Sequence, residues 1–441
     1  MVAVSQMLFV AWLSPAQFGV WATATASMAV LTGLVNFGEV NGYLAGGARS
    51  LGEVRRSIWR LNAILTAGAF AVVGGYWYSG RHDLAVLVAL IGLNLPLLGE
   101  CNLLYAAYVR RTENGRLVRA QAISAAARTA LGLAVAWLTE SAIAFAAAML
   151  LYSVAMIILL SPGTRQWPER AGDRLTAVGW RVRGAWSAQA LSQLLPTQVD
   201  FLVVSVVAGP SLLGVYFFAY QVTVGLSAMV AGPLVKSVLS TLAAQDEQAR
   251  PALAERLMST VAALAGGVAA VGVGVITVAG GALPSQWEGA AATIGLLLAS
   301  VPARFLSVIS DAAQMAAGAW WRSSGLNALD AVGTAAVALT AVAGDITVLA
   351  IAVVGWKVAF MCVRVWRSPL GLPAWQRVVV AAPTVLVALS LVTAVLAGPP
   401  YLWFLTISVL VVSGGRLFTL WRVRRPVAVP AGAVAAESSW S

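Results

Sequence analysis

The sequence contains few of the residues that perform catalysis or bind metals in soluble enzymes. It has one histidine, His82, and two cysteines, Cys101 and Cys362, and only 10% of its 441 residues are charged. The cysteines lack the spacing of a metal site, and neither a zinc motif nor a phosphate-binding glycine loop occurs. Histidine-based catalysis, a zinc centre and ATP hydrolysis therefore have no support in the sequence.

Long hydrophilic stretches are also lacking, because 60% of the residues are hydrophobic. Apolar runs of about 20 residues, long enough to cross about 30 Å of hydrocarbon, recur from end to end without strand-like alternation. The sequence predicts an all-α polytopic membrane protein with about fourteen transmembrane helices. They are expected at 1–13, 17–38, 58–79, 84–106, 120–138, 141–160, 184–208, 213–235, 258–280, 288–315, 325–344, 346–363, 378–398 and 401–420.

Basic residues gather on one side of these spans. Arginine-bearing loops, such as those around Arg49 and Arg165, alternate with short connections such as 79–83 and 209–212, where Arg81 is the only basic residue. Short basic loops remain in the cytoplasm, so both termini are expected there. The net charge of +11 then reflects orientation and contact with anionic lipid rather than nucleic-acid binding. A composition rich in Ala, Val, Gly and Arg is typical of a high-GC bacterium, and the expected location is the bacterial cytoplasmic (inner) membrane.

One turn occurs twice. The sequence SPAQFGVW at 14–21 returns as GPSLLGVY at 209–216, and each copy joins one apolar span to the next. Such a repeat indicates a transporter built from two related bundles with a substrate path between them. The predicted units are a six-helix bundle at 1–183, a second at 184–377, two additional helices at 378–421 and a disordered tail at 422–441.

The first predicted helix is short by this comparison. Its counterpart before Gly209 starts near Gly184, whereas about 13 residues precede Ser14, too few to span a membrane. We expect the true N-terminus to lie upstream of Met1 because of a misassigned start codon. A re-entrant or tilted short helix is the alternative.

Three cationic residues fall near the middle of predicted spans: Arg128, Arg304 and Lys357. Charge is costly in hydrocarbon, so each is a candidate for substrate binding. Arg128 shares a helical face with Gln121 and Ser124, and Arg304 shares one with a serine, an aspartate and a glutamine, so both faces are interpreted as cavity walls. Lys357 stands alone and is also expected to extend toward the cytoplasmic headgroups.

The acidic counterparts include Glu100, Asp200 and Asp311. Asp200 ends a polar row on its helix, in which Pro196 frees a backbone carbonyl and is expected to kink the helix toward a cavity. These carboxylates could pair with Arg128 or Arg304 as fixed struts, or take up H⁺ or Na⁺ as a coupling device. The sequence leaves both roles open.

Aromatic residues allow two interpretations. Most of the 17 tryptophans, Trp287 among them, lie near predicted span ends and are typical of an interfacial belt. Trp21, Tyr216 and Tyr220 lie instead near or on the polar stripe of the helix that follows each turn. Because sugar rings stack on aromatic side chains, these three are candidates for sugar contact.

The repeated turn resembles the [Gly/Ser]-Pro-x-x-[Phe/Leu]-Gly-x-[Tyr/Trp] turn in each half of the polysaccharide-biosynthesis flippases. These are the Wzx-like O-antigen and exopolysaccharide translocases of the multidrug/oligosaccharidyl-lipid/polysaccharide (MOP) exporter superfamily. The segment 34–49, with FGE at 37–39 and then Arg49, and DFLV at 200–203 are also similar to that family. The resemblance covers most of the chain.

This resemblance implies a transporter, not an enzyme, that flips a polyprenyl-pyrophosphate-linked oligosaccharide across the cytoplasmic membrane by alternating access. An anionic pyrophosphate and a hydrated sugar need a wet cavity with fixed positive charge and a lateral opening for the tail. Arg128 and Arg304 are therefore expected to contact pyrophosphate, with Arg49 as its first contact at the cytoplasmic mouth. Asp200 or Asp311 would position them or couple the cycle to an ion.

The expected partners are the lipid-linked glycan, membrane lipids and other polysaccharide-assembly proteins, and no cofactor is expected apart from a coupling ion, H⁺ or Na⁺. A drug or metabolite exporter of the same superfamily is one alternative, although its cavity would be acidic. A membrane-embedded polysaccharide polymerase or ligase is another, although the predicted outer loops are short for one.

Overall fold

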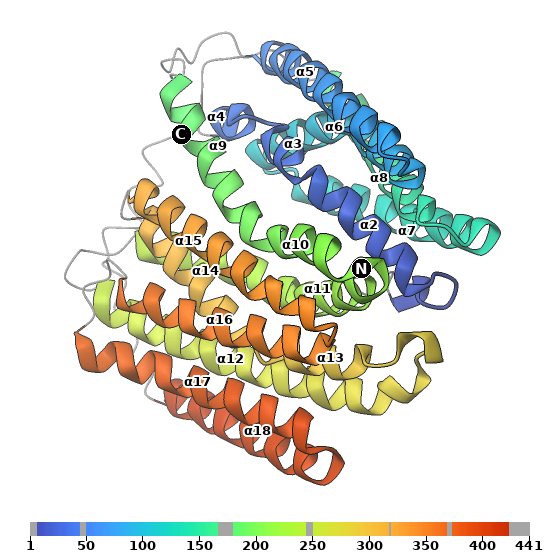
Figure 1. Ribbon diagram of the computed structural model, residues 1–441. Helices are drawn as coiled ribbons and strands as arrows, with labels where there is room; N and C mark the ends of the chain where they lie inside the picture. The colour runs from blue at the N-terminus through green and yellow to red at the C-terminus, as the bar shows by residue number, and fades with distance from the viewer. Residues whose placement is uncertain are drawn as a thin grey trace, which may run out of the picture.

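The computed structural model describes residues 7–44, 50–165, 180–243, 250–316, 319–367 and 373–422. Every element within these ranges is a helix, which confirms the all-α class. Figure 1 shows two groups of helices side by side, one formed by the first third of the chain and the other by the rest.

The first group begins with one span in three pieces and continues with four long helices. Its helices are α2 (Pro15–Ser27), α3 (Ala29–Leu34), α4 (Glu39–Leu44), α5 (Leu51–Tyr78), α6 (His82–Arg110), α7 (Asn114–Thr139) and α8 (Ile143–Arg165). Helices α5 and α6 pack as one antiparallel pair, and α7 and α8 as another.

The second group contains the remaining helices and several 3-10 turns. Its α-helices are α9 (Trp180–Leu194), α10 (Val199–Val207), α11 (Gly209–Ala243), α12 (Arg250–Ala279), α13 (Ala290–Leu298), α14 (Val301–Ala316), α15 (Trp320–Ala338), α16 (Ile346–Trp366), α17 (Ala374–Ala397) and α18 (Pro399–Arg422). Helices α17 and α18 pack against each other and against α12, at one edge of the group (Figure 1).

The predicted spans agree with these helices from the second span to the last. Of the first, at 1–13, the structure describes only the part from Met7, which is helical at 7–9 and turns before Pro15. In the described residues, nine helices are long and apolar enough to cross a membrane. They become ten if the bent pair Ser285–Leu298 and Val301–Gln314 is counted as one span.

Besides this bent pair, two further spans are interrupted, where the sequence contains helix breakers or polar side chains. Between α9 and α10 a 3-10 turn at Leu195–Thr197 holds Pro196, the residue expected to kink this helix. Between α3 and α4 the chain turns through Phe37 and Gly38, which have φ of 35° and 69°. Asn62 Nδ2 donates to the Val35 carbonyl at 3.0 Å, which satisfies an oxygen that the break has freed.

The two ends of the molecule differ in charge. We call the end that contains Leu51, Arg110, Asn114 and Trp366 the basic end, because arginines gather there in the sequence. The opposite end, which contains Tyr78 and the start of α2, is the short-loop end. Contacts between the groups are made mainly by α2, α3 and α4 on one side and α9, α10 and α11 on the other.

At the short-loop end the two copies of the repeated turn pack against each other. A methyl group added to Gly19 would overlap the carbonyl of Pro210, and one added to Gly214 would overlap the carbonyl of Pro15. Each glycine thus admits the proline carbonyl of the other copy, and no larger residue fits without displacing the backbone. The repeat is therefore a self-complementary joint between the two groups.

Aromatic side chains surround this joint. Phe18 of the first copy makes edge contacts with Phe145, Phe218 and Trp287, at ring-centroid distances of 4.9, 5.9 and 4.8 Å. Trp287 comes from the connection before α13 and is only 1% exposed. Its interpretation as part of an interfacial belt is therefore wrong, because the ring fills the junction between the groups instead of facing lipid.

Candidate functional site

Most of the buried charge lies inside the second group, in three clusters along its length. The first cluster, nearest the basic end, is centred on Asp311 of α14 and Arg364 of α16. The pair is 3.3 Å apart, and the Arg364 guanidinium also donates to the Ser307 carbonyl at 3.1 Å and to the side chain of Asn327. Arg364 is 2% exposed, so this is a fully enclosed ion pair.

Helices α9 and α15 complete the Asp311 cluster. Gln193 Nε2 donates to Asp311 Oδ2 at 2.7 Å, and Ser323 donates to the other carboxylate oxygen. Gln189 donates to Ser323 and accepts from Ser324, at 2.9 and 2.5 Å. Four helices are thus held together by side-chain hydrogen bonds, which are needed because lipid offers no alternative partner.

The second cluster is built on Asp330 of α15 and Lys357 of α16. The Lys357 Nζ lies 2.8 Å from Asp330 Oδ1 and donates to Thr334 at 2.9 Å, and the Trp356 indole donates to Asp330 at 2.9 Å. Lys357 is 8% exposed. The sequence-based picture of an isolated lysine reaching for headgroups is wrong, because its ammonium is paired inside the group.

The third cluster contains Asp200, Tyr216, Tyr220 and Arg304. Asp200 is 1% exposed and accepts from the Tyr216 hydroxyl at 2.7 Å and from the Phe201 amide at 2.9 Å. Both donors are neutral, and within the described residues no basic side chain lies within ion-pair distance of Asp200. This distinguishes Asp200 from Asp311 and Asp330, which are neutralised by a cation.

Arg304 is enclosed by the same cluster without a carboxylate of its own. Its guanidinium lies 4.8 Å from the centre of the Tyr220 ring, and its Nε donates to Ser300 at 3.0 Å. One terminal nitrogen is buried without a hydrogen-bond partner in the described part of the chain. Arg304 therefore keeps donor capacity that an anion could use.

The first group contains fewer buried charges. Glu100 of α6 pairs with Arg55 at 2.8 Å and accepts from the Trp59 indole at 3.0 Å, close to the basic end. Arg128 lies half-buried on α7, which packs mainly on α8, and the described residues provide no hydrogen bond or ion pair for it. The expected pairing of the carboxylates with Arg128 or Arg304 is thus not observed, since Glu100 and Asp311 pair with other arginines and Asp200 accepts only from neutral donors.

The aromatic candidates are buried rather than displayed to a cavity. Trp21 stacks on Phe145 with ring centroids 5.5 Å apart, and Tyr216 and Tyr220 both pack on Phe201. In this conformation other rings pack against all three, and the Arg304 guanidinium also lies over Tyr220. Arg49, the expected first contact of the headgroup, lies outside the described residues.

Several polar residues were missed as site candidates. Arg364 and Arg183 lie near the ends of predicted spans, where loop arginines are common, yet Arg364 is enclosed in a buried pair and Arg183 in a partly buried one. Asn327 was also missed. The available signal was that Asn327 lies three residues before Asp330, on the same helical face. Its partner Arg364, however, lies on another helix.

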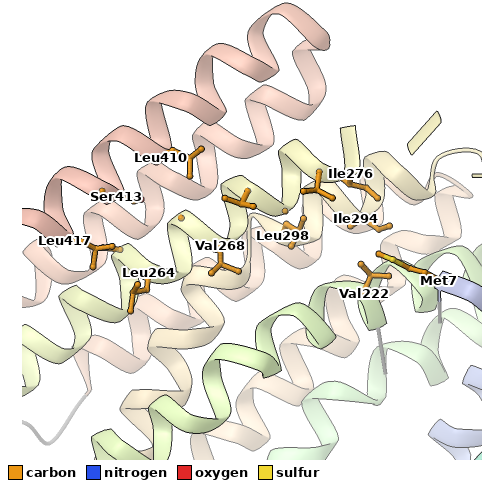
Figure 2. A pocket seen from close by; sticks show the side chains of 16 residues that line it. Met7, Val222, Leu264, Val268, Ile276, Ile294, Leu298, Leu410, Ser413 and Leu417 are labelled. Carbon is orange, nitrogen blue, oxygen red and sulfur yellow. The ribbon is translucent and has the colours of Figure 1, made fainter. Parts of the chain in front are cut away.

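An apolar groove of about 540 Å³ runs along α12 and α18 (Figure 2). Of its 16 lining residues only Ser413 has a polar side chain. Figure 2 places Leu264 and Leu417 at one end and Met7 and Ile276 at the other. A second apolar hollow of about 490 Å³ continues it past Trp403, sharing Val271, Val275 and Leu410.

The groove and the Arg304 cluster lie on opposite sides of the same helices. On α11, Val222 lines the groove, whereas Tyr220, two residues earlier, contacts Arg304. Likewise Leu298, the last residue of α13, lines the groove, whereas Ser300, in the bend before α14, accepts from Arg304. Residues two apart on a helix point in roughly opposite directions. The second group thus has an apolar outer side and a cationic inner side separated by α11 and the α13–α14 span.

Comparison with known proteins connects this architecture with a family. Residues 10–290 match the family model described as "Polysaccharide biosynthesis protein". The chain belongs to this family of polysaccharide biosynthesis proteins. The match covers both copies of the repeated turn, and it confirms the resemblance drawn from the sequence.

The fold has a counterpart among solved structures. A structure titled "Lipid II flippase MurJ, inward closed conformation" superposes with a TM-score of 0.62, covering 96% of this chain and 97% of that one at 9% identity. At this identity the likeness shows the fold alone. No curated protein matches the sequence.

Proposed function

We propose that this protein flips a polyprenyl-pyrophosphate-linked oligosaccharide from the cytoplasmic to the outer leaflet of a bacterial inner membrane, and is not an enzyme. The observation that carries the proposal is the amphipathic wall of the second group. Its outer side has a groove of lipid-tail character, and its inner side holds Arg304 with an unused donor. A lipid-linked anion needs both surfaces at once.

The polysaccharide biosynthesis family and the fold shared with a lipid II flippase support the same substrate class. We assign the basic end to the cytoplasm, since short basic loops stay on that side. In alternating access, the predicted bundle at 1–183, which contains the first group, would rock against the predicted bundle at 184–377, which lies in the second group. Membrane lipids, and other proteins of polysaccharide assembly, are the proposed partners.

Asp200 is our candidate for the coupling group. A carboxylate that accepts only from neutral donors can gain a proton or a small cation without first breaking an ion pair. Asp311 and Glu100 serve as struts in this proposal, because each already neutralises an arginine. Transport by Asp200→Asn should lose its dependence on the proton or sodium gradient, whereas Asp311→Asn should mainly destabilise the protein.

The central test uses purified protein in liposomes with a fluorescent polyprenyl-pyrophosphate-linked sugar and a membrane-impermeant quencher. We expect Arg304→Ala to abolish flipping while the protein remains folded and inserted. Normal flipping by Arg128→Ala and by Arg304→Ala would rule out these arginines as the anion site. Binding of cationic drugs without any flipping would favour the drug exporter instead.

The role of the groove in binding the lipid tail is tested by a substitution that fills it. Val271→Trp places a large ring in the groove and should reduce flipping about tenfold by excluding the lipid tail, the factor that a loss of about 1.4 kcal/mol of binding produces. Val332→Trp is the matched control, because Val332 is exposed on α15 and lines neither hollow. Equal flipping by the two variants would remove the groove from the proposal.

A further inference from the structure

Within the described residues, an ion pair joins the two groups at the basic end. Arg183 Nη1 of α9 lies 2.5 Å from Glu39 Oε1 of α4. Ser57 of α5 donates to the same carboxylate oxygen at 2.8 Å. The two ionic side chains are 22% and 8% exposed, so the pair is accessible at one edge and enclosed elsewhere.

The backbone delivers Glu39 to this position. Gly38 adopts φ of 69°, and a Cβ there would lie 2.7 Å from the Arg183 carbonyl oxygen and 2.9 Å from its Cα. The unwound segment between α3 and α4 therefore presses directly on the first turn of α9, which only glycine allows. Glu39 is the first residue after this segment, so the ion pair and the close contact form or separate together.

Arg183 does not use its full hydrogen-bonding capacity in this pair. Its Nη1 meets one carboxylate oxygen of Glu39, and its buried Nε finds no partner among the described residues. A guanidinium has five donors in a planar fork that fits phosphate oxygens in bidentate fashion. A pyrophosphate could therefore satisfy Arg183 more completely than Glu39 does.

Exchange of partners also avoids an energetic problem. Separating Glu39 from Arg183 without replacement would leave a poorly solvated cation between the groups. An arriving anion keeps Arg183 neutralised while it frees Glu39, and with it α4, from α9. Arrival of the headgroup and separation of the groups at this end are then one event.

We propose that Arg183 is the first anion site on the transport path, where the substrate pyrophosphate displaces Glu39 and so opens the basic end between the two groups. This inference rests on the proposed function for the identity of the ligand. It predicts a response of the interface to pyrophosphate itself, which can be measured without transport.

The experiment reports opening by cysteine labelling. Leu191 of α9 is partly buried against Gly33 of α3, so Leu191→Cys in a background with Cys101 and Cys362 replaced by alanine is less accessible while the interface is closed. Labelling by an impermeant maleimide is followed in inside-out vesicles. The probes are a polyprenyl pyrophosphate in the bilayer and free inorganic pyrophosphate in solution.

Polyprenyl pyrophosphate should accelerate labelling about tenfold in the wild type, and Glu39→Gln should show this rate without any probe. In Arg183→Gln the cysteine should also be labelled fast, and the labelling rate should not change when the probe is added. The double exchange Glu39→Arg with Arg183→Glu should restore slow labelling but not the response. Arg183→Lys should keep slow labelling and respond only at higher probe concentration, since an ammonium offers no planar fork.

Two controls match these variants. Arg322→Gln removes an exposed arginine of α15 at the same end, and Asp83→Asn removes an exposed acid at the opposite end; both should behave as wild type. Acceleration by free inorganic pyrophosphate at equal strength would assign the site to the anion alone, whereas acceleration only by the lipid form would show that the tail must bind as well.

The inference is overturned if Glu39→Gln and Arg183→Gln label as slowly as wild type, or if Arg183→Gln still responds to the probe. It can fail separately from the proposed function. If the protein flips its substrate but pyrophosphate does not change the labelling rate, only the exchange of partners at Arg183 is refuted. If pyrophosphate changes the labelling rate but no flipping occurs, only the flippase function is refuted.

Discussion

The two ends of the interface between the groups are closed by opposite kinds of contact. At the short-loop end, backbone meets backbone at Gly19 and Gly214, and Phe18 and Trp287 fill the surrounding space. At the basic end, the ion pair between Arg183 and Glu39 accompanies the close contact at Gly38. Figure 1 shows the two ends at opposite extremes of the helices.

The difference indicates which end can respond to an anion. Packing of apolar groups and backbone has no charge for a ligand to compete with, so the short-loop end is stabilised equally with or without substrate. An ion pair can exchange one partner for another of the same sign. The first step of a cycle should therefore start at the basic end, and four experiments examine this asymmetry.

Trp287→Ala should have the largest effect. It leaves a cavity where the indole packs between Phe18 and Phe218, and we expect a loss of about 3–5 kcal/mol in the free energy of unfolding. Thermal unfolding in detergent measures this loss. Trp321→Ala is the control, since Trp321 is 74% exposed on α15 and should change stability little. Equal losses in the two variants would show that Trp287 does not seal the end.

Gly214→Ala should come next, at about 1–3 kcal/mol, because its methyl group meets the backbone of Pro15. Gly74→Ala should do the reverse and stabilise slightly, because nothing lies within 4 Å of its added Cβ and alanine favours helix. The same thermal unfolding measurement compares them. A neutral Gly214→Ala would mean that the two turns are not in tight contact.

Ser57→Ala should have a smaller effect, confined to the basic end. It removes one hydrogen bond from the Glu39 carboxylate, a loss of about 1 kcal/mol. Labelling of Leu191→Cys should then be about fivefold faster, while labelling of Leu212→Cys in the second turn should stay unchanged. Faster labelling at both positions would indicate general loosening instead.

Ionic strength should produce the smallest effect. At 1 M salt the screening length falls to about 3 Å, which weakens a partly exposed pair such as Arg183 and Glu39. We expect labelling at Leu191→Cys to rise about two- to threefold and labelling at Leu212→Cys to stay constant. A salt response at the short-loop end would contradict the assignment of apolar closure to that end.

Much of the fold could be predicted from the sequence because hydropathy and turn chemistry are local. The spans, the break at Pro196 and the repeated turn all follow from neighbouring residues. That the two copies of the turn touch each other did not follow, since Gly19 and Pro210 meet only when two distant segments pack.

The ionic partners could be predicted less well for a related reason. Lys357 was seen without a partner because Asp330 lies on the preceding helix, and pairing depends on how two helices are rotated against each other. Arg183 and Arg364 lie near span ends, where loop arginines are common, so their position concealed their burial. The sequence thus indicated that charged side chains lie within the spans, but not which side chain each of them pairs with.

The joint between Gly19 and Gly214 has a consequence for how such a protein can change over time. Because each glycine admits the proline carbonyl of the other copy, a larger residue at either position disturbs both. The two turns are therefore selected as a single unit, whereas the helices that follow them are free to diverge. A duplicated segment can keep its signature at the joint long after the rest of the two halves has lost its likeness.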